Sequence, residues 1–181
     1  MRVIAGKYRG KCLEAPTGDS VRPTTDRIKE TMFNILQCYT PSAIVLDLFA
    51  GSGALGIEAL SRGAEFVDFV DVSENSLTYV RKNLKGIDEK TYKVSKADFK
   101  AFLNSCEKKY DLIFIDAPYK GEIGQNAVRQ AIELDLLNDG GMLVYEHATD
   151  NVIDFNDEKY SVRTKKMGNT TAEFIEKLCL E

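Results

Sequence analysis

The fold of this chain follows from residues 45–57, which are Val45-Leu46-Asp47-Leu48-Phe49-Ala50-Gly51-Ser52-Gly53-Ala54-Leu55-Gly56-Ile57. The apolar run 44–49 predicts a buried parallel strand in which Asp47 is the one charged residue. Small residues at 51–53 permit a sharp turn, and residues 54–62 have helical character up to Gly63, a residue suited to a left-handed helix end. The stretch therefore predicts a strand, a glycine loop and a helix whose N-terminal N–H groups face the carboxyl end of the strand.

An acidic residue follows the glycine loop at a distance typical of nucleotide-binding proteins. The glycines have the spacing Gly51-x-Gly53-x-x-Gly56, and Asp71 lies 20 residues after Gly51, directly after the apolar run 66–70. A carboxylate in this position accepts hydrogen bonds from ribose hydroxyls. The glycine spacing alone is a weak signal, because any tight turn between a strand and a helix favours glycine. The strand context and the acid together favour a nucleotide-type binding site.

The composition indicates one ordinary globular domain. Of the 181 residues, 44% are hydrophobic and 29% are charged, which is typical of a soluble protein. The sequence has neither an apolar run of membrane-spanning length nor an apolar signal region at its N-terminus. We therefore expect a cytoplasmic protein with no membrane partner.

The use of cysteine and histidine argues against a metal site. The four cysteines are widely separated, and no pair has metal-ligand or CxxC spacing, which favours reduced thiols; they are Cys12, Cys38, Cys106 and Cys179. His147 is the only histidine, so neither a zinc cluster nor a Ser/His/Asp hydrolase is indicated. A structural role is favoured for His147, and we expect no bound metal.

Charge is distributed unevenly along the chain. The net charge is −4, but residues 1–40 carry seven Lys or Arg against four Asp or Glu, and residues 1–11 contain no acid. Strand candidates at 2–6 and 11–15 flank a basic turn and predict a β-hairpin. A basic extension on an acidic body indicates contact with a polyanion, although charge alone supports a solvated hairpin face equally well.

Strands and helices alternate from residue 24 onward. A helix is expected from Thr24 or Thr25 to about Gln37, ahead of the strand at 44–49. The later strand candidates are 66–70, 92–94, 111–115, 142–146, 160–165 and 173–178, and the later helix candidates follow Ser73, follow Asp98 and span 127–137. This order predicts an α/β fold with a mostly parallel seven-stranded sheet and a C-terminal antiparallel hairpin. We expect a single domain over residues 1–181, in which 1–23 form a basic N-terminal β-hairpin extension and 24–181 form a Rossmann-like core.

A second motif, Asp116-Ala117-Pro118-Tyr119, follows the strand predicted at 111–115. Pro118 disfavours helical geometry at Ala117 and would hold the Asp116 carboxylate near the Ala117 carbonyl. Two such acceptors can bind both N–H groups of an aromatic amine and stabilise the positive charge that develops as its nitrogen attacks an electrophile. Tyr119 can stack on the base. In isolation the tetrapeptide is more typical of a surface turn, but its place after a buried strand favours the catalytic interpretation.

Together these motifs resemble class I S-adenosylmethionine-dependent methyltransferases that act on an amino group. The N-terminal motifs Arg2-Val3-Ile4-Ala5-Gly6-Lys7-Tyr8-Arg9-Gly10 and Arg22-Pro23-Thr24-Thr25-Asp26-Arg27 are similar to those of the RsmD-type enzymes, which methylate N2 of a guanine in 16S ribosomal RNA. The resemblance covers nearly the whole chain and implies the class I methyltransferase fold. The sequence departs from the pattern at Ala117, where such turns usually have proline; the carbonyl is kept, but the turn loses stiffness.

The resemblance also implies roles for individual residues. Gly51 and Gly53 would approach the methionine part of S-adenosylmethionine, Asp71 would bind the ribose, and Asp98 would bind the adenine amine. The residue type and position of Asp98 are otherwise better explained by a helix cap. The implied cofactor-binding set is Asp47, Gly51, Gly53, Asp71, Asp98 and Phe99. The implied catalytic set is Asp116, Ala117, Pro118 and Tyr119, and the implied RNA-binding set is Arg2, Lys7, Arg9, Lys11 and Arg22.

The partner implied is 16S ribosomal RNA within a partly or fully assembled small ribosomal subunit. An amino-group DNA methyltransferase, acting on adenine N6 or cytosine N4, is an alternative, although no target-recognition domain is evident. A nicotinamide-dependent oxidoreductase would need a Tyr/Lys or histidine arrangement that the sequence does not indicate. An RNA-binding ribosome assembly factor with a vestigial cofactor pocket is a third alternative, against which Asp116 and Tyr119 argue.

Overall fold

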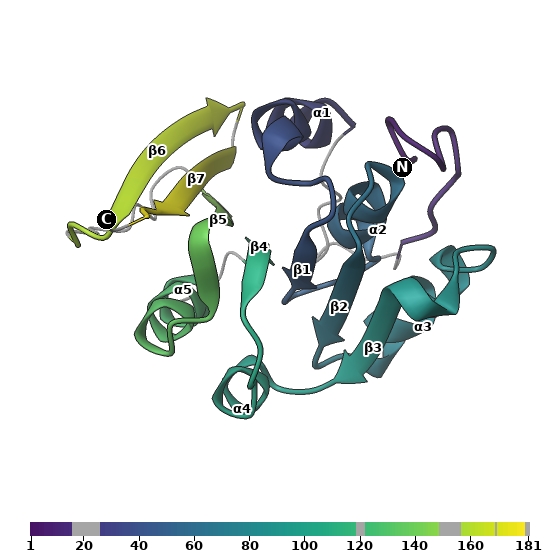
Figure 1. Ribbon diagram of the computed structural model, residues 1–181. Helices are drawn as coiled ribbons and strands as arrows, with labels where there is room; N and C mark the ends of the chain where they lie inside the picture. The colour runs from purple at the N-terminus through teal and green to yellow at the C-terminus, as the bar shows by residue number, and fades with distance from the viewer. Residues whose placement is uncertain (16–25, 119–121, 149–156, 169, 180–181) are drawn as a thin grey trace.

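The computed structural model describes residues 1–15, 26–118, 122–148, 157–168 and 170–179 (Figure 1). Its α-helices are α1 (Asp26–Ile35), α2 (Ala54–Ser61), α3 (Glu74–Asn83), α4 (Phe99–Asn104) and α5 (Ile123–Glu133). Its strands are β1 (Ile44–Asp47), β2 (Phe66–Asp71), β3 (Tyr92–Lys96), β4 (Tyr110–Ile115), β5 (Leu137–Ala148), β6 (Tyr160–Met167) and β7 (Thr170–Lys177). Short 3-10 helices cover Leu36–Cys38 and Glu89–Thr91.

The strands form one seven-stranded sheet with the order β3-β2-β1-β4-β5-β7-β6. The first five strands in this order, β3, β2, β1, β4 and β5, pair in parallel. Parallel pairing is possible because a helix crosses over between successive strands of the chain. β7 pairs antiparallel with both β5 and β6, and Gly168, with a φ of 70°, lies in the turn between β6 and β7. The predicted α/β fold, with its mostly parallel seven-stranded sheet and C-terminal antiparallel hairpin, is therefore confirmed.

Helices cover both faces of the sheet and separate its apolar core into two parts (Figure 1). On one face α1, α2 and α3 bury side chains such as Phe33, Ile57 and Leu77 against the sheet. On the other face α4 and α5 bury Leu103 and Val128. Because both faces are covered, the central strands consist almost entirely of buried apolar residues, as the sequence of β1 and β4 predicts.

Several helix ends follow the predicted local chemistry. The Ser73 hydroxyl accepts a hydrogen bond from the Ser76 N–H at 3.3 Å and caps α3. Gly63, with a φ of 99°, follows α2 in the left-handed conformation that a residue with a Cβ rarely adopts. These ends confirm that short-range signals in the sequence determine where α2 stops and α3 starts.

The prediction for α5 and β5 was wrong in its boundaries. α5 spans Ile123–Glu133 rather than 127–137, and β5 begins at Leu137 rather than 142. The helix includes Gly124, a poor helix former whose missing Cβ leaves room for Tyr145: an added Cβ would lie 2.5 Å from the Tyr145 Cε2 atom. It ends early because Asp135 adopts a left-handed conformation with a φ of 51°, a position where glycine is the usual signal.

The N-terminal segment forms only part of the predicted β-hairpin. Residues 1–15 contain one antiparallel bridge, between Arg2 and Cys12, and their two arms pair through three backbone hydrogen bonds: the Val3 N–H donates to the Lys11 carbonyl at 3.0 Å, the Gly10 N–H to the Val3 carbonyl at 2.9 Å and the Leu13 N–H to the Met1 carbonyl at 3.0 Å, but neither arm is a regular strand. The backbone N–H groups of residues 4, 5, 7 and 8 donate to α2 instead of to a partner strand. The rest of the predicted extension, including Arg22, and the predicted helix caps Thr24 and Thr25 lie outside the described residues.

Within the described ranges, no helix combines the length and the apolarity that a membrane crossing requires. Among these same residues, no three His, Cys, Asp or Glu side chains gather in a way that could hold a metal ion.

Candidate active site

The sheet order places the two sequence motifs side by side. β1 lies between β2 and β4, because the chain first adds strands on one side of β1 and then crosses to its other side. The carboxyl ends of these three parallel strands carry Asp47, Asp71 and Asp116. Ligands of open α/β sheets bind at such a change of direction, outside the carboxyl ends of the strands. The candidate site is therefore centred between β1 and β4.

The glycine loop has the backbone conformation that its sequence predicts. Gly51 and Gly53 have φ values of 55° and 78°, in the left-handed region. The Ala50 N–H donates to the Val70 carbonyl at 3.0 Å, so the loop is joined to the end of β2. A Cβ added at Gly51 would meet only the Phe49 carbonyl oxygen, at 3.9 Å, which leaves the backbone open to an approaching ligand.

Asp71 braces the loop and lies at its rim. One of its carboxylate oxygens accepts a hydrogen bond from the Gly51 N–H at 2.9 Å, and the other accepts one from the Ser73 N–H at 2.8 Å. Each carboxylate oxygen has a further lone pair, so Asp71 retains capacity to bind ligand hydroxyls. The next residue, Val72, is 66% exposed, and sequence analysis did not single it out. It offers an apolar surface beside Asp71 at the carboxyl edge of the sheet.

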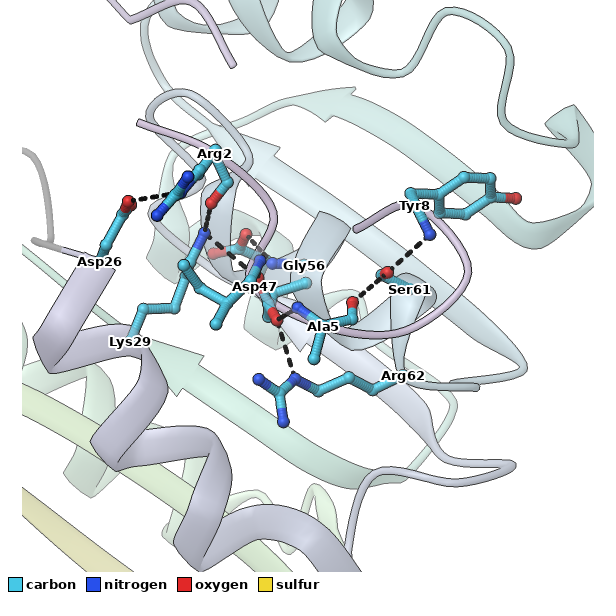
Figure 2. Close-up of polar contacts among 11 residues, drawn as sticks. Arg2, Ala5, Tyr8, Asp26, Lys29, Asp47, Gly56, Ser61 and Arg62 are labelled. Atoms are coloured by element: carbon cyan, nitrogen blue, oxygen red, sulfur yellow. Dashed lines mark hydrogen bonds and ion pairs between the residues drawn. The ribbon is translucent and has the colours of Figure 1, made fainter. Parts of the chain in front are cut away.

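Asp47 points into the protein rather than to its surface. Its side chain is 2% exposed, and its carboxylate accepts a hydrogen bond from the Gly56 N–H at 3.0 Å, which fixes α2 against β1 (Figure 2). Gly56 permits this close packing, since an added Cβ would lie 2.3 Å from Cε1 of Phe69. Burial, together with the nearby Asp116 and Asp71 carboxylates, raises the pKa of Asp47 to about 7. The structure thus gives Asp47 a place behind the glycine loop.

Asp98 caps α4, as its residue type alone indicates. Its Oδ1 atom accepts hydrogen bonds from the N–H groups of Lys100 at 2.9 Å and Ala101 at 3.4 Å. The adjacent Phe99 lies against Phe49, with ring centroids 5.6 Å apart. Phe49 lies two residues after β1, and sequence analysis placed it in the strand without assigning it a part in the site. The two rings form an aromatic surface near the carboxyl ends of the strands.

The turn after β4 lies where the motif predicts. The Leu48 N–H donates to the Phe114 carbonyl at 3.1 Å, which continues the pairing of β1 and β4 toward the turn. Asp116 is half-buried, Ala117 is 5% exposed, and Pro118 is exposed. Tyr119 lies outside the described residues. The first three residues of the motif are therefore held at the same edge as the glycine loop.

The predicted RNA-binding residues fall into two groups. The Arg2 guanidinium pairs with the Asp26 carboxylate at 3.2 Å, and the Lys11 ammonium donates to the Lys85 carbonyl at 2.6 Å. Lys7 and Arg9 are exposed on the turn between them, and the Lys7 ammonium lies 5.3 Å from the Tyr8 ring centroid. Lys7 and Arg9 are thus the better placed for a contact with a polyanion.

Two buried charged residues were missed from the sequence. Glu58 of α2 and Lys29 of α1 are each 0% exposed, and their charged groups are 3.2 Å apart. A signal for Glu58 exists, because it is the single charge in the otherwise apolar or small sequence of α2. No comparable signal marks Lys29, since α1 carries several charged residues.

His147 forms a buried pair with Glu173. Its Nε2 atom lies 3.4 Å from the Glu173 carboxylate, and both side chains are 1% exposed. Burial lowers the pKa of His147, but the hydrogen bonds to Glu173 and to the Ala148 carbonyl outweigh it, so the pKa is raised. This arrangement supports the structural role that the sequence favoured for His147.

Residues 1–176 match the model of the protein family described as Conserved hypothetical protein 95. The chain belongs to this family. YlbH of Bacillus subtilis is 41% identical over 151 residues, covering 81% of this chain and 82% of that protein. The ribosomal RNA small subunit methyltransferase D of Escherichia coli is 30% identical over 172 residues, covering 95% and 87%.

Solved structures agree with the family match. The Escherichia coli protein yhhF superimposes with a TM-score of 0.88 at 29% sequence identity, covering 99% of each chain. The agreement over almost the entire length confirms that this member of the Conserved hypothetical protein 95 family has the Rossmann-like fold of its methyltransferase neighbours.

Proposed function

We propose that this protein is an S-adenosylmethionine-dependent methyltransferase that transfers a methyl group to the exocyclic N2 of a guanine in small-subunit ribosomal RNA. The observation that supports this most directly is the meeting of the glycine loop and the Asp116-Ala117 turn at the change of strand order between β1 and β4. The name of the Escherichia coli relative, a ribosomal RNA small subunit methyltransferase, supports the choice of substrate over DNA.

The residues at the carboxyl edge fit S-adenosylmethionine. Gly51 and Gly53 leave the loop backbone open, and Asp71 keeps hydrogen-bonding capacity at the rim for ribose hydroxyls. Asp98 and Phe99 provide an acceptor and an aromatic face for the adenine. When bound, the cofactor supplies an electrophilic methyl group attached to a positively charged sulfur. Asp47 acts behind this site by holding α2 and its N-terminal N–H groups in place.

The turn after β4 would bind the amino group that receives the methyl. The Asp116 carboxylate and the Ala117 carbonyl each accept a hydrogen bond from one N–H of guanine N2, and so hold the nitrogen in position. They would also stabilise the positive charge that grows on this nitrogen as its bond to the methyl carbon forms and the methyl–sulfur bond breaks; S-adenosylhomocysteine would leave, and the surplus proton would pass from the nitrogen to solvent. Tyr119 would stack on the guanine, which must leave its own stack to reach the site.

The N-terminal extension would contact the RNA backbone through Lys7 and Arg9, which are exposed, with Arg2, Lys11 and Arg22 nearby in the sequence. Such contacts position the RNA without reading its sequence. The substrate we infer is 16S ribosomal RNA in a partly or fully assembled small subunit, which would place the enzyme in the cytoplasm.

Nucleoside mass spectrometry tests the proposal. Small subunits or 16S ribosomal RNA isolated from cells that lack this protein are incubated with the purified protein and S-adenosylmethionine, and the RNA is digested to nucleosides. We expect N2-methylguanosine to appear, and we expect far less of it with the Asp116→Ala variant. A product methylated on a ring carbon or on a ribose hydroxyl, or the absence of methylation from both substrates, would contradict the proposal.

A further inference from the structure

The first residues of the chain are bound to α2 by a buried carboxylate. The Glu58 carboxylate accepts hydrogen bonds from the Ile4 N–H at 2.8 Å and from the Ala5 N–H at 3.1 Å. The side chain of Glu58 is 0% exposed, while Ile4 and Ala5 are half-buried, so the two bonds are partly shielded from water. A short stretch of backbone from the extension is thus bound by one acidic side chain of the core.

Two basic residues form ion pairs with Glu58. The Lys29 ammonium lies 3.2 Å from one carboxylate oxygen, and the Arg62 guanidinium lies 2.8 Å from the other. Lys29 also donates to the Arg2 carbonyl at 2.6 Å, so α1 binds the same segment (Figure 2). Buried ion pairs contribute little net stability compared with apolar residues of similar size. Their arrangement here is better explained by what they hold, which is the backbone of residues 2–5.

Ser61, one turn after Glu58, continues this contact. Its hydroxyl donates to the Ala5 carbonyl at 2.5 Å and accepts from the Tyr8 N–H at 2.9 Å (Figure 2). Its backbone carbonyl accepts from the Lys7 N–H at 2.7 Å. Gly6 passes so close that an added Cβ would lie 1.8 Å from the Ser61 carbonyl oxygen. The backbone on both sides of Gly6 is therefore held on the C-terminal end of α2, while Lys7 and Arg9 remain exposed.

We infer that Glu58 is a positioning residue for RNA binding. It fixes the backbone of residues 4–5 on α2, and this holds the exposed residues Lys7 and Arg9 in a defined position before RNA binds. This inference rests on the proposed contact between the extension and RNA. Holding the segment in place before binding matters because ordering a free segment at the moment of binding would reduce the affinity for RNA. Glu58 itself touches neither the RNA nor the cofactor, so the transfer step should not depend on it.

The test replaces both members of the buried pair, since removing one alone would leave an uncompensated charge and could unfold the protein. The variant is Glu58→Gln with Lys29→Met. It removes the two fully buried charges and the Lys29 bond to the Arg2 carbonyl, keeps the partly exposed Arg62 guanidinium, and leaves one side-chain carbonyl for two N–H donors. We expect KM for RNA to rise about five- to thirtyfold, with kcat at saturating RNA and the Kd for S-adenosylmethionine unchanged. Amide hydrogen exchange at residues 4 and 5 should become faster, which reports the loss of docking directly.

Two further variants serve as matched comparisons. Glu65→Gln makes the same acid-to-amide change at an exposed position close to the end of α2 and should leave KM unchanged. Ser61→Ala removes the hydroxyl contacts without disturbing a charge, and should raise KM in the same direction even if the double variant fails to fold.

A third variant separates failure of this inference from failure of the proposed function. Lys7→Gln with Arg9→Gln removes the proposed phosphate contacts and leaves the anchors in place. If it does not raise KM for RNA, the proposed RNA contact is wrong. If it raises KM, while the Glu58 and Ser61 variants show faster exchange at residues 4–8 with an unchanged KM, docking has no consequence for RNA and the inference about Glu58 is overturned.

Discussion

At the scale of single residues, the carboxylates of the candidate site differ in burial and in their position relative to the glycine loop. Asp71 lies at the rim and accepts backbone hydrogen bonds, whereas Asp47 is buried behind the loop. Burial disfavours the charged form of a carboxylate, which is why the pKa of Asp47 is raised to about 7. Asp47 therefore affects the stability of the fold in a way that depends on pH.

Replacing Asp47 by Asn should make the protein more stable at pH 8 and change little at pH 4. In the native protein the folded state holds a proton on Asp47 up to a pKa of about 7, while the unfolded value is 3.8. The folded state thus binds more protons between these values, and stability falls as pH rises through this window. Asn keeps an acceptor for the Gly56 N–H and has no proton to lose.

The gain at pH 8 should be at most about 4 kcal/mol, at about 1.4 kcal/mol per pKa unit. Urea denaturation of the variant and the parent protein at pH 4 and pH 8 measures it. A stability difference between the two proteins that is the same at both pH values would show that Asp47 titrates normally.

Replacing Asp116 by Ala should lower kcat by about 10²- to 10³-fold, the scale for losing one preorganised polar group in a transition state. Binding of S-adenosylmethionine should survive, because the glycine loop, Asp71 and Asp98 are unchanged. Single-turnover kinetics and calorimetry separate the two effects. An unchanged rate of the chemical step would argue against hydrogen bonding of the amine by Asp116.

At the scale of elements, α3 joins the glycine loop to the N-terminal extension. Asn83, in the last turn of α3, donates to the Ser52 carbonyl and to the Glu14 carbonyl, each at 2.8 Å, and accepts from the Glu14 N–H at 2.9 Å. Asn83 is buried, and these three bonds account for both of its amide donors and its acceptor. The position of the loop backbone therefore depends on a side chain of the following helix.

Replacing Asn83 by Leu should weaken cofactor binding about five- to thirtyfold and lower stability by about 1–3 kcal/mol, because buried backbone groups lose their partners. Calorimetry with S-adenosylmethionine and thermal unfolding measure these effects. Asn75→Leu, at an exposed position on the same helix, is the control and should leave both unchanged. Equal cofactor affinities for the Asn83 variant and the control would show that the Ser52 carbonyl needs no such support.

At the scale of the whole molecule, charge is separated between a basic N-terminal segment and an acidic remainder, with a net charge of −4. The basic segment packs on α2 and α3, next to the glycine loop that precedes α2 (Figure 1). An acidic body repels RNA in general, so a localised basic contact favours one orientation of the bound RNA.

Neutralising Lys7 and Arg9 together should reduce the salt dependence of RNA binding. Each phosphate contact contributes about 0.7–0.9 to the slope of log K against log salt, so the slope should fall by up to about 1.8. Cofactor affinity should not change. RNA binding measured between 50 and 200 mM salt checks this expectation. An unchanged slope would show that Lys7 and Arg9 make no phosphate contact.

Much of the site could be predicted because its signals are local. The glycines at 51 and 53, the cap residues Ser73 and Asp98, and the acid ending β2 each act within a few residues of their own position. The alternation of strands and helices predicts a parallel sheet, and it restricts the ligand site to the edge of this sheet where the carboxyl ends of the strands meet. The α/β class, the order of most elements and the neighbourhood of Asp71 and Asp116 were determined by the sequence alone.

Only the tertiary structure decided the contacts that join distant parts of the chain. Lys29 and Glu58 form a buried pair, and Asn83 binds both Ser52 and Glu14, but neither arrangement has a spacing that a sequence pattern marks. The expected hairpin in residues 1–15 is limited to the pairing around Arg2 and Cys12, because the N–H groups of Ile4, Ala5 and Tyr8 donate to the buried side chains of Glu58 and Ser61 instead. A local pattern specifies the hydrogen bonds that a segment can make, and packing decides which of the available partners it meets.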